Sequence, residues 1–193
     1  MKKTIRNSIA NLLKVFSEYP DIFLTESDVR SYLFAILIRN NPRLLRPQKT
    51  RDDSFSIPIH SEVRWYGLFN KDRLRYRSDV VILVPEDLRV KDGLFRIPSK
   101  GFGFNSYYGI IEIKLRRING DPDNKFLSKI KKDLIRLKEI RKRTITHNKI
   151  KKPIYYLVCL DKKNNIENDI ESRIQSTLKL SDDIFLEYAF SRS

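Results

Sequence analysis

The stretch that decides the fold runs from Tyr107 to Leu115 and reads Tyr-Tyr-Gly-Ile-Ile-Glu-Ile-Lys-Leu. An apolar run of this length is typical of a strand that is covered on both faces. Such a strand normally excludes charge, because an unpaired buried ion is costly, yet Glu112 and Lys114 stand near its end. Strand residues two apart share a face, so these two side chains are predicted to point to one side while Ile111 and Ile113 pack on the other.

Four further segments around this run are predicted to be strands. Ser78 to Val84 and Ile154 to Leu160 are continuous apolar runs, whereas Ile59 to Leu68 alternates between polar and apolar residues. Ile184 to Phe190 is the last predicted strand. The segment from Pro85 to about Asn105 is predicted to be a loop or arm.

Helical spacing of apolar residues predicts helices over Lys3 to Tyr19, Glu26 to Asn40, Lys125 to Arg143 and Ile166 to Leu180. Thr25 is the expected N-cap of the second helix. The basic stretch from residue 42 to 56 is predicted to be an irregular loop. The order α-α-β-β-β-α-β-α-β predicts an α/β fold with a central mixed sheet flanked by helices, in a single domain spanning 1–193.

The composition narrows the class of protein. The chain has 193 residues, with 39 Lys and Arg against 24 Asp and Glu, which gives a net charge of +15. A polyanion is the expected partner, because each cation that neutralises a phosphate releases condensed counterions; charge that serves only solubility is the alternative. One cysteine excludes an internal disulfide, and one Cys with two His cannot supply the four ligands of a structural zinc site.

The sequence also bears on location. No apolar run approaches the ~20 residues that span a bilayer. The first residues lack the apolar core and cleavage site of a signal peptide. We therefore expect no membrane partner and a cytoplasmic location, which is the host cytoplasm if the source is viral.

Two acidic residues are expected to meet at one end of the predicted sheet. Asp79 opens one buried strand and Glu112 lies near the end of the next, so antiparallel pairing would place the two carboxylates side by side. Two such carboxylates repel each other unless a cation joins them, and Mg²⁺ prefers oxygen ligands. Asp79, Glu112 and the carbonyl of Ile113 are therefore the predicted metal ligands, and Lys114 would orient or activate a water molecule or stabilise developing charge.

This pattern resembles the PD-(D/E)XK nuclease superfamily, which includes restriction enzymes, Holliday-junction resolvases and repair nucleases. Asp79 matches its first acidic position, and Glu112-Ile113-Lys114 matches (D/E)-x-K, although Ser78 stands where proline is usual. The resemblance implies a restriction-endonuclease-like core, α-β-β-β-α-β, over about residues 25–161, with an extra N-terminal helix and a C-terminal α-β extension. It also implies an acidic residue on the helix before the strands, which Glu26, or in its place Asp28, would provide.

The resemblance further implies metal-dependent hydrolysis of phosphodiester bonds in DNA, including branched or recombination and repair intermediates. Mg²⁺ is the implied cofactor, with Mn²⁺ as a substitute, and RNA stays open as a substrate. A homodimer is expected because cutting both strands usually requires two sites. A non-catalytic nucleic-acid-binding protein on the same fold, and an interaction subunit that meets an acidic protein, are the alternative functions.

Basic residues near the predicted site are candidates for phosphate contact. The helix from Lys125 to Arg143 carries many cations and few acids, which favours a surface that binds phosphates over an ordinary solvated face. The candidate nucleic-acid-binding residues are Arg116, Arg117, Lys129, Lys132 and Arg136.

Several other residues have two interpretations each. Glu62 either supplies a further ligand or holds Lys114, or else it is a cross-strand partner for Arg73, Arg75 or Arg77. His60 is either a general base or an ordinary hydrogen-bonding residue. Asp133 either steadies a catalytic lysine or pairs along its helix. Cys159 is interpreted as a residue that packs in the core. For Trp65 and Tyr66, packing is preferred over stacking on a nucleic-acid base.

Overall fold

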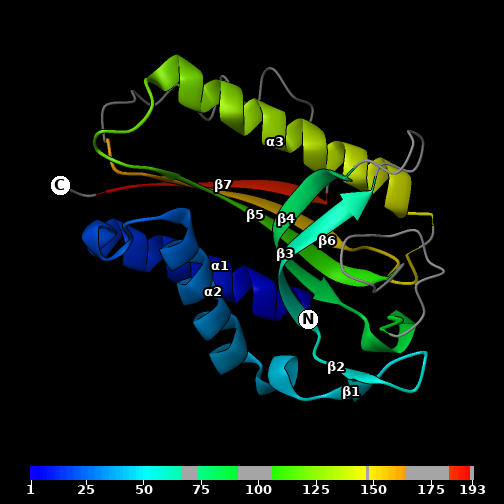
Figure 1. Cartoon of the computed structure of the whole chain (residues 1–193). Helices are drawn as coiled ribbons and strands as arrows, with labels where there is room; N and C mark the ends of the chain where they lie inside the picture. Colours follow the sequence, from blue (N-terminus) through cyan, green and yellow to red (C-terminus); the bar gives the residue numbers. More distant parts are fainter. Residues whose placement is uncertain (67–73, 91–105, 147, 164–182, 192–193) are drawn as a thin grey trace.

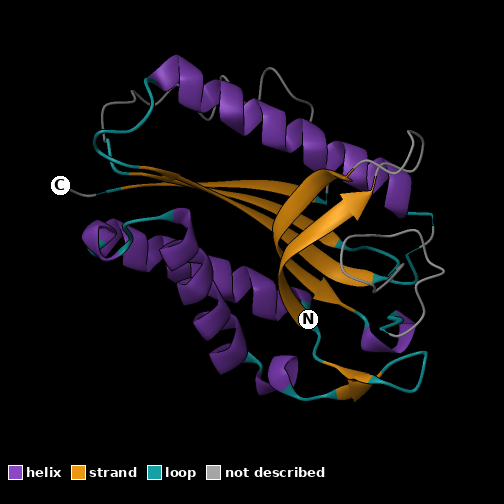
Figure 2. Cartoon of the chain, viewed as in Figure 1, coloured by secondary structure: helices purple, strands orange, loops and turns teal. Residues whose placement is uncertain are grey.

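The computed structural model describes residues 1–66, 74–90, 106–146, 148–163 and 183–191. It is an α/β fold in which a five-stranded sheet has the order β3-β4-β5-β6-β7. Helices cover both faces of this sheet, with α3 on one side and α1 and α2 on the other (Figure 1, Figure 2). The predicted α/β class with a mixed sheet is confirmed.

The first three strands of the sheet form an antiparallel meander. β3 (Ile59–Tyr66) pairs with β4 (Leu74–Leu83), and β4 pairs with β5 (Tyr107–Arg116). β5 then pairs in parallel with β6 (Ile154–Asp161), and β6 pairs in parallel with β7 (Ile184–Phe190). The long helix α3 (Asp123–Thr144) connects the two parallel strands β5 and β6, because parallel neighbours need a crossover.

Apolar residues of the sheet divide into two cores. Ile111 and Ile113 pack in the core beneath α1 (Lys2–Glu18) and α2 (Glu26–Asn40). Ile110 packs in the second core, under the apolar stripe of α3. This division confirms the predicted alternation of β5, in which the isoleucines on either side of Glu112 face away from α3.

The start of α2 is fixed by a capping box. The Thr25 hydroxyl accepts a hydrogen bond from the backbone N–H of Asp28, and the Asp28 carboxylate accepts one from the backbone N–H of Thr25. These bonds satisfy backbone donors that the first turn of a helix leaves without intrahelical partners. The predicted N-cap is confirmed, and it fixes the position of Glu26, the first residue of α2.

Some element boundaries differ from the prediction. β4 begins at Leu74 rather than Ser78, because Tyr76 and Arg77 continue the pairing with β3 although they are not part of the apolar run. The segment 42–56 is not wholly irregular, since it contains the 3-10 helix η2 (Pro42–Leu45) and a small pair of strands, β1 (Gln48–Lys49) and β2 (Phe55–Ser56). A further 3-10 helix, η1 (Pro20–Ile22), joins α1 to α2, and η3 (Pro85–Asp87) follows β4.

Three predictions lie wholly or partly outside the described residues. They are the predicted helix from Ile166 to Leu180, the last two residues of the predicted strand Ile59 to Leu68, and residues 91–105 of the predicted loop or arm. Within the described part of the chain, no helix is both long enough and apolar enough to cross a membrane.

Candidate active site

The two predicted acidic residues meet where β4 and β5 diverge. The last paired residues are Val80 and Ile111, so Asp79 and Glu112 lie one step further along the two strands. There the Asp79 carboxylate accepts a hydrogen bond from the backbone N–H of Ile113 at 2.8 Å. The side chain of Asp79 thus takes the place of a backbone partner and holds the two strands together.

Both acids open into one cavity of about 370 Å³ at this end of the sheet. The residues that line it come from the helices on both faces of the sheet as well as from its strands. They are Glu26, Arg64, Tyr76, Arg77, Asp79, Glu112, Lys114, Asp133 and Arg136, and we call this space the reaction cavity. The structure therefore brings together all four predicted catalytic side chains, Glu26, Asp79, Glu112 and Lys114.

The environment of the two carboxylates disfavours their negative charge. Burial raises the pKa of Glu112 well above its usual range, and the charges of Asp79 and Asp133 raise it further against the hydrogen bond from Ser78. Burial also raises the pKa of Asp79, against the opposing effects of the Ile113 N–H and the Lys114 charge. Asp79 thus raises the pKa of Glu112, and Glu26 raises that of Asp79, so the negative charges of this cavity would be stabilised by a nearby cation.

Lys114 lies between helices from the two faces of the sheet. Its ammonium is 3.0 Å from a carboxylate oxygen of Asp133 on α3 and 3.8 Å from one of Glu26 on α2. Burial disfavours the charged form of Lys114, but the surrounding carboxylates outweigh this effect and raise its pKa. Lys114 is therefore an ammonium ion at neutral pH, suited to stabilising negative charge rather than to removing a proton.

Asp133 holds Lys114 as well as pairing along its own helix. Its side chain is buried, and its second oxygen accepts a hydrogen bond from Arg136 at 2.9 Å. Both interpretations of Asp133 from the sequence thus describe contacts that the structure contains. Glu26 is held in turn, because its carboxylate also accepts a hydrogen bond from the backbone N–H of Leu115 at 3.3 Å.

Arg30 of α2 extends the site toward β3. Its guanidinium pairs with Glu62 and lies 3.5 Å from a carboxylate oxygen of Asp79. Glu62 also pairs with Arg77 at 2.6 Å, so the predicted cross-strand interpretation holds and Glu62 makes no contact with Lys114 in the described structure. Glu62 has a φ of 57°, which is a left-handed backbone conformation. This conformation costs a non-glycine residue about 1–3 kcal/mol, and residues that adopt it are often found at functional sites.

The donor set fits a magnesium ion with few protein ligands. The backbone N–H of Ile113 points toward Asp79. Since the N–H and the carbonyl of one strand residue point to the same side of the strand, the Ile113 carbonyl is also directed toward Asp79. Among the described residues there is no group of three or more His, Cys, Asp or Glu side chains that could hold a metal. Mg²⁺ commonly uses one or two carboxylates and completes its shell with water and substrate phosphate, which matches this set.

The predicted nucleic-acid-binding residues have different environments. Arg116 contradicts the prediction: it is 1% exposed, its guanidinium pairs with Asp161 and Asp123, and it stacks over the Phe126 ring. Buried and paired in this way, Arg116 stabilises the fold and is not available to a phosphate. The burial of Arg116 could not be predicted from its neighbours in the sequence, because its partner Asp161 lies 45 residues away in the chain.

The other four candidates are accessible. Arg117 and Lys132 are exposed, and neither has an ion pair among the described residues. Lys129 pairs with Asp121, and Arg136 lines the reaction cavity. The basic helix α3 has more acidic partners than its own sequence indicates, because Asp121 and Asp183 of other segments pair with Lys129 and Arg141.

Other candidates are placed outside the site or given structural roles. His60 Nε2 lies 2.7 Å from the Ile57 carbonyl and does not line the reaction cavity, which supports the ordinary hydrogen-bonding interpretation. Trp65 donates to the Ser78 hydroxyl and packs edge-on against Tyr107. Asp28 is engaged in the capping box, so Glu26 is the acid of α2 that reaches the cavity. Cys159 is buried in β6, and burial raises its pKa.

Sequence reasoning missed the arginines that surround the carboxylates. Arg30 lies four residues after Glu26 and therefore on the same side of α2, a spacing that could have identified it. Arg64 and Arg77 are brought together by the pairing of β3 with β4, in which they face each other.

Comparisons of this chain with protein-family models, with curated proteins and with solved structures gave no match.

Proposed function

We propose that this chain is a metal-dependent nuclease that hydrolyses phosphodiester bonds in DNA, on a core like that of the PD-(D/E)XK superfamily. The order α2-β3-β4-β5-α3-β6 follows the core order of that superfamily. The Asp79 and Glu112-Ile113-Lys114 motif lies at the point where β4 and β5 diverge. These two features support the proposal independently, since one is topological and the other chemical.

One observation carries the proposal: among the described residues, Glu112 is the acid of the reaction cavity that forms no ion pair with a Lys, Arg or His. Glu26 and Asp133 pair with Lys114, and Arg30 lies near Asp79. Among the described residues no Lys, Arg or His forms an ion pair with Glu112, whose hydrogen-bond partner is the Ser78 hydroxyl. A partly buried carboxylate beside a second carboxylate is expensive unless a cation joins them, so a metal ion accounts for this pair.

The residues of the cavity have separate roles in the proposed reaction. Asp79, Glu112 and the Ile113 carbonyl would hold Mg²⁺, which lowers the pKa of a bound water and polarises a phosphate oxygen. The Lys114 ammonium, held by Asp133 and Glu26, stabilises the negative charge that develops on the phosphate. Arg64, Arg77 and Arg136 place further positive charge around the same cavity, where a phosphate backbone would pass.

The proposal is tested by cleavage of supercoiled and branched DNA with Mg²⁺, Mn²⁺ or EDTA. We expect cleavage with either metal, and loss of cleavage in Asp79→Asn, Glu112→Gln and Lys114→Ala with DNA binding retained. Glu18→Gln is the matched control, because Glu18 is an exposed acid at the end of α1 that pairs only weakly, at 4.0 Å, with Lys14. Cleavage that persists in carefully purified Glu112→Gln would refute the site.

A second candidate is a non-catalytic nucleic-acid-binding protein. It is favoured by the arginines of the reaction cavity, which would attract a phosphate whether or not a metal is bound. The same assay separates the two functions, since a protein that only binds DNA gains nothing from Mg²⁺. Tight binding without cleavage under any metal condition would favour this second function.

A further inference from the structure

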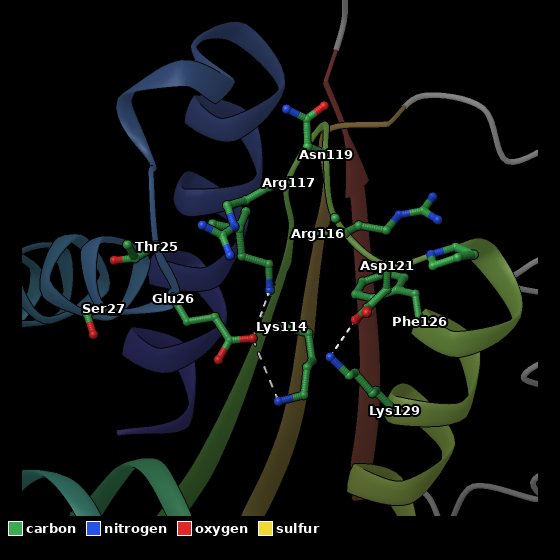
Figure 3. A pocket seen from close by; sticks show the side chains of 13 residues that line it. Thr25, Glu26, Ser27, Lys114, Arg116, Arg117, Asn119, Asp121, Phe126 and Lys129 are labelled. Carbon is green, nitrogen blue, oxygen red and sulfur yellow. Dashed lines mark hydrogen bonds and ion pairs between the residues drawn. The ribbon is translucent and has the colours of Figure 1, made fainter.

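Three cavities follow one another along the end of β5. The reaction cavity shares Glu26 and Lys114 with a neighbouring space of about 590 Å³, which we call the flanking cavity (Figure 3). The flanking cavity in turn shares Arg117 and Asn119 with a third space of about 390 Å³, the exit cavity. Each adjoining pair shares lining residues, so the three cavities lie side by side along the end of β5, and we call them together the trench.

The flanking cavity has the size of a site for one nucleotide. Pockets for organic ligands typically measure about 300–1,000 Å³, and this cavity falls within that range. Figure 3 shows Glu26 and Lys114 at one end of the cavity and Asn119 at the other. A molecule that enters from the reaction cavity therefore passes the Lys114 ammonium and meets the turn that follows β5.

That turn is held in one conformation by Gly120. The Gly120 N–H donates to the Arg117 carbonyl at 2.8 Å, and a Cβ atom on Gly120 would lie 2.8 Å from the same oxygen. Any larger residue would therefore force the turn to shift. The turn places Arg117, Ile118 and Asn119 together on the wall of the trench.

The charge of the trench suits a phosphodiester chain. Arg117 is exposed, lines both the flanking and the exit cavity, and has no ion pair among the described residues. Its neighbour Arg116, by contrast, is fully engaged by Asp161 and Asp123. Arg117 is thus a cation left available for a ligand, three residues after Lys114.

The exit cavity adds apolar surface. Leu24 is 67% exposed and Ile118 is 62% exposed, and the two line this cavity together with Lys162. Exposed apolar side chains beside cations fit unpaired bases, whose flat faces are free to pack. The bases of a duplex are stacked on one another and cannot offer those faces.

We propose that this trench binds a single nucleic-acid strand, so that the substrate is DNA with unpaired nucleotides beside the cleaved bond. The inference rests on the proposed function for the position of that bond, but strand binding can be measured without cleavage. Phosphates would pass Lys114 and Arg117, one nucleotide would occupy the flanking cavity, and the strand would leave between Leu24 and Ile118. Continuous duplex DNA bound only along the basic face of α3 is the competing outcome.

Fluorescence anisotropy tests the inference with the full chain in EDTA, where a metal-dependent nuclease cannot act. The probes are a labelled single-stranded oligonucleotide of about 12 nucleotides and a duplex of the same length. We expect tighter binding of the single strand. Arg117→Glu should weaken single-strand binding roughly tenfold, and Ile118→Ser should weaken it while leaving duplex binding unchanged.

Lys152→Glu is the matched control. It makes the same change of charge at an exposed lysine that precedes β6, and residues at the start of β6 pair with the start of β5, at the far end of the sheet from the trench. Equal or tighter binding of the duplex, or an Arg117→Glu effect no larger than that of Lys152→Glu, would overturn the inference. Single-strand preference without any metal-dependent cleavage would instead support the trench and refute the nuclease.

Discussion

Replacing Arg116 with methionine tests whether this arginine stabilises the fold or binds phosphate. The Arg116 Nε donates to Asp161 at 2.7 Å, and both side chains are fully buried. Asp161 also accepts a hydrogen bond from the Tyr188 hydroxyl at 2.6 Å and one from the backbone N–H of Lys163 at 2.9 Å. Methionine fills much of the space of the arginine stem but leaves the Asp161 carboxylate without its cation.

The expected loss is large because the pair is buried. Removing one partner of a buried ion pair costs about 3–5 kcal/mol, since the other charge stays buried and uncompensated. The two remaining hydrogen bonds to Asp161 keep the loss at the lower end of that range, so we expect the free energy of unfolding to fall by about 3 kcal/mol. Arg117→Met, at the exposed neighbouring position, should change it by less than about 0.5 kcal/mol.

Urea unfolding followed by circular dichroism measures both variants. Arg116→Lys provides a milder test if Arg116→Met fails to fold, because lysine keeps the charge but cannot reproduce the two-nitrogen contact with Asp161. The double variant Arg116→Met/Asp161→Asn should recover part of the loss, as it removes the orphaned charge. Similar stabilities for Arg116→Met and Arg117→Met would refute the structural role of Arg116.

Three further predictions concern charge and burial. Burial raises the folded-state pKa of Glu112, so the contribution of Glu112 to stability is full at acid pH and is lost as the pH rises through that pKa. At about pH 8 without metal, Glu112→Gln should therefore unfold at a higher urea concentration than the native chain, and the two should unfold alike near pH 4. Added Mg²⁺ should reverse the order at pH 8, because it should stabilise the native chain alone. Hydrogen bonds from Lys129 and Lys125 lower the pKa of Asp121 to about 2, so Lys129→Ala should raise the pKa of Asp121 in a carboxyl NMR titration, and an unchanged titration would contradict the contact. Burial raises the pKa of Cys159 and shields it, so iodoacetamide at about pH 8 should label this thiol only after unfolding, and rapid labelling of the native chain would show the assignment to the core to be wrong.

Local patterns predicted most of the described elements. The helices α1, α2 and α3 begin and end within a few residues of the predicted bounds, because each carries an apolar stripe at helical spacing. The early start of β4 was missed because Tyr76 and Arg77 owe their strand conformation to β3, not to their own apolar character. Tertiary pairing overrides local pattern in such a segment.

The acids and Lys114 of the candidate site were predictable, whereas most of its arginines were not. Asp79 and Glu112 could be placed together from two buried strands and one assumption about their pairing, which the register bears out. The fate of Arg116 could not be foreseen, because its partners Asp161 and Asp123 belong to other elements. An arginine that follows an E-x-K motif can face either a ligand or a buried carboxylate. The neighbouring sequence is the same in both cases, so it does not distinguish them.

Arg116 and Arg117, at the end of β5, have opposite environments, and the proposed function gives them different roles. Strand residues two apart share a face, so Glu112, Lys114 and Arg116 all point to the α3 side of the sheet. There Lys114 pairs with Asp133, whereas Arg116 stacks over Phe126 and pairs with Asp161 of the neighbouring strand. Arg117, the first residue beyond the strand, is left exposed on the wall of the trench. The buried arginine fixes the end of β5 against β6 and the start of α3, and the proposed binding of a phosphate chain by its neighbours would depend on this rigid support.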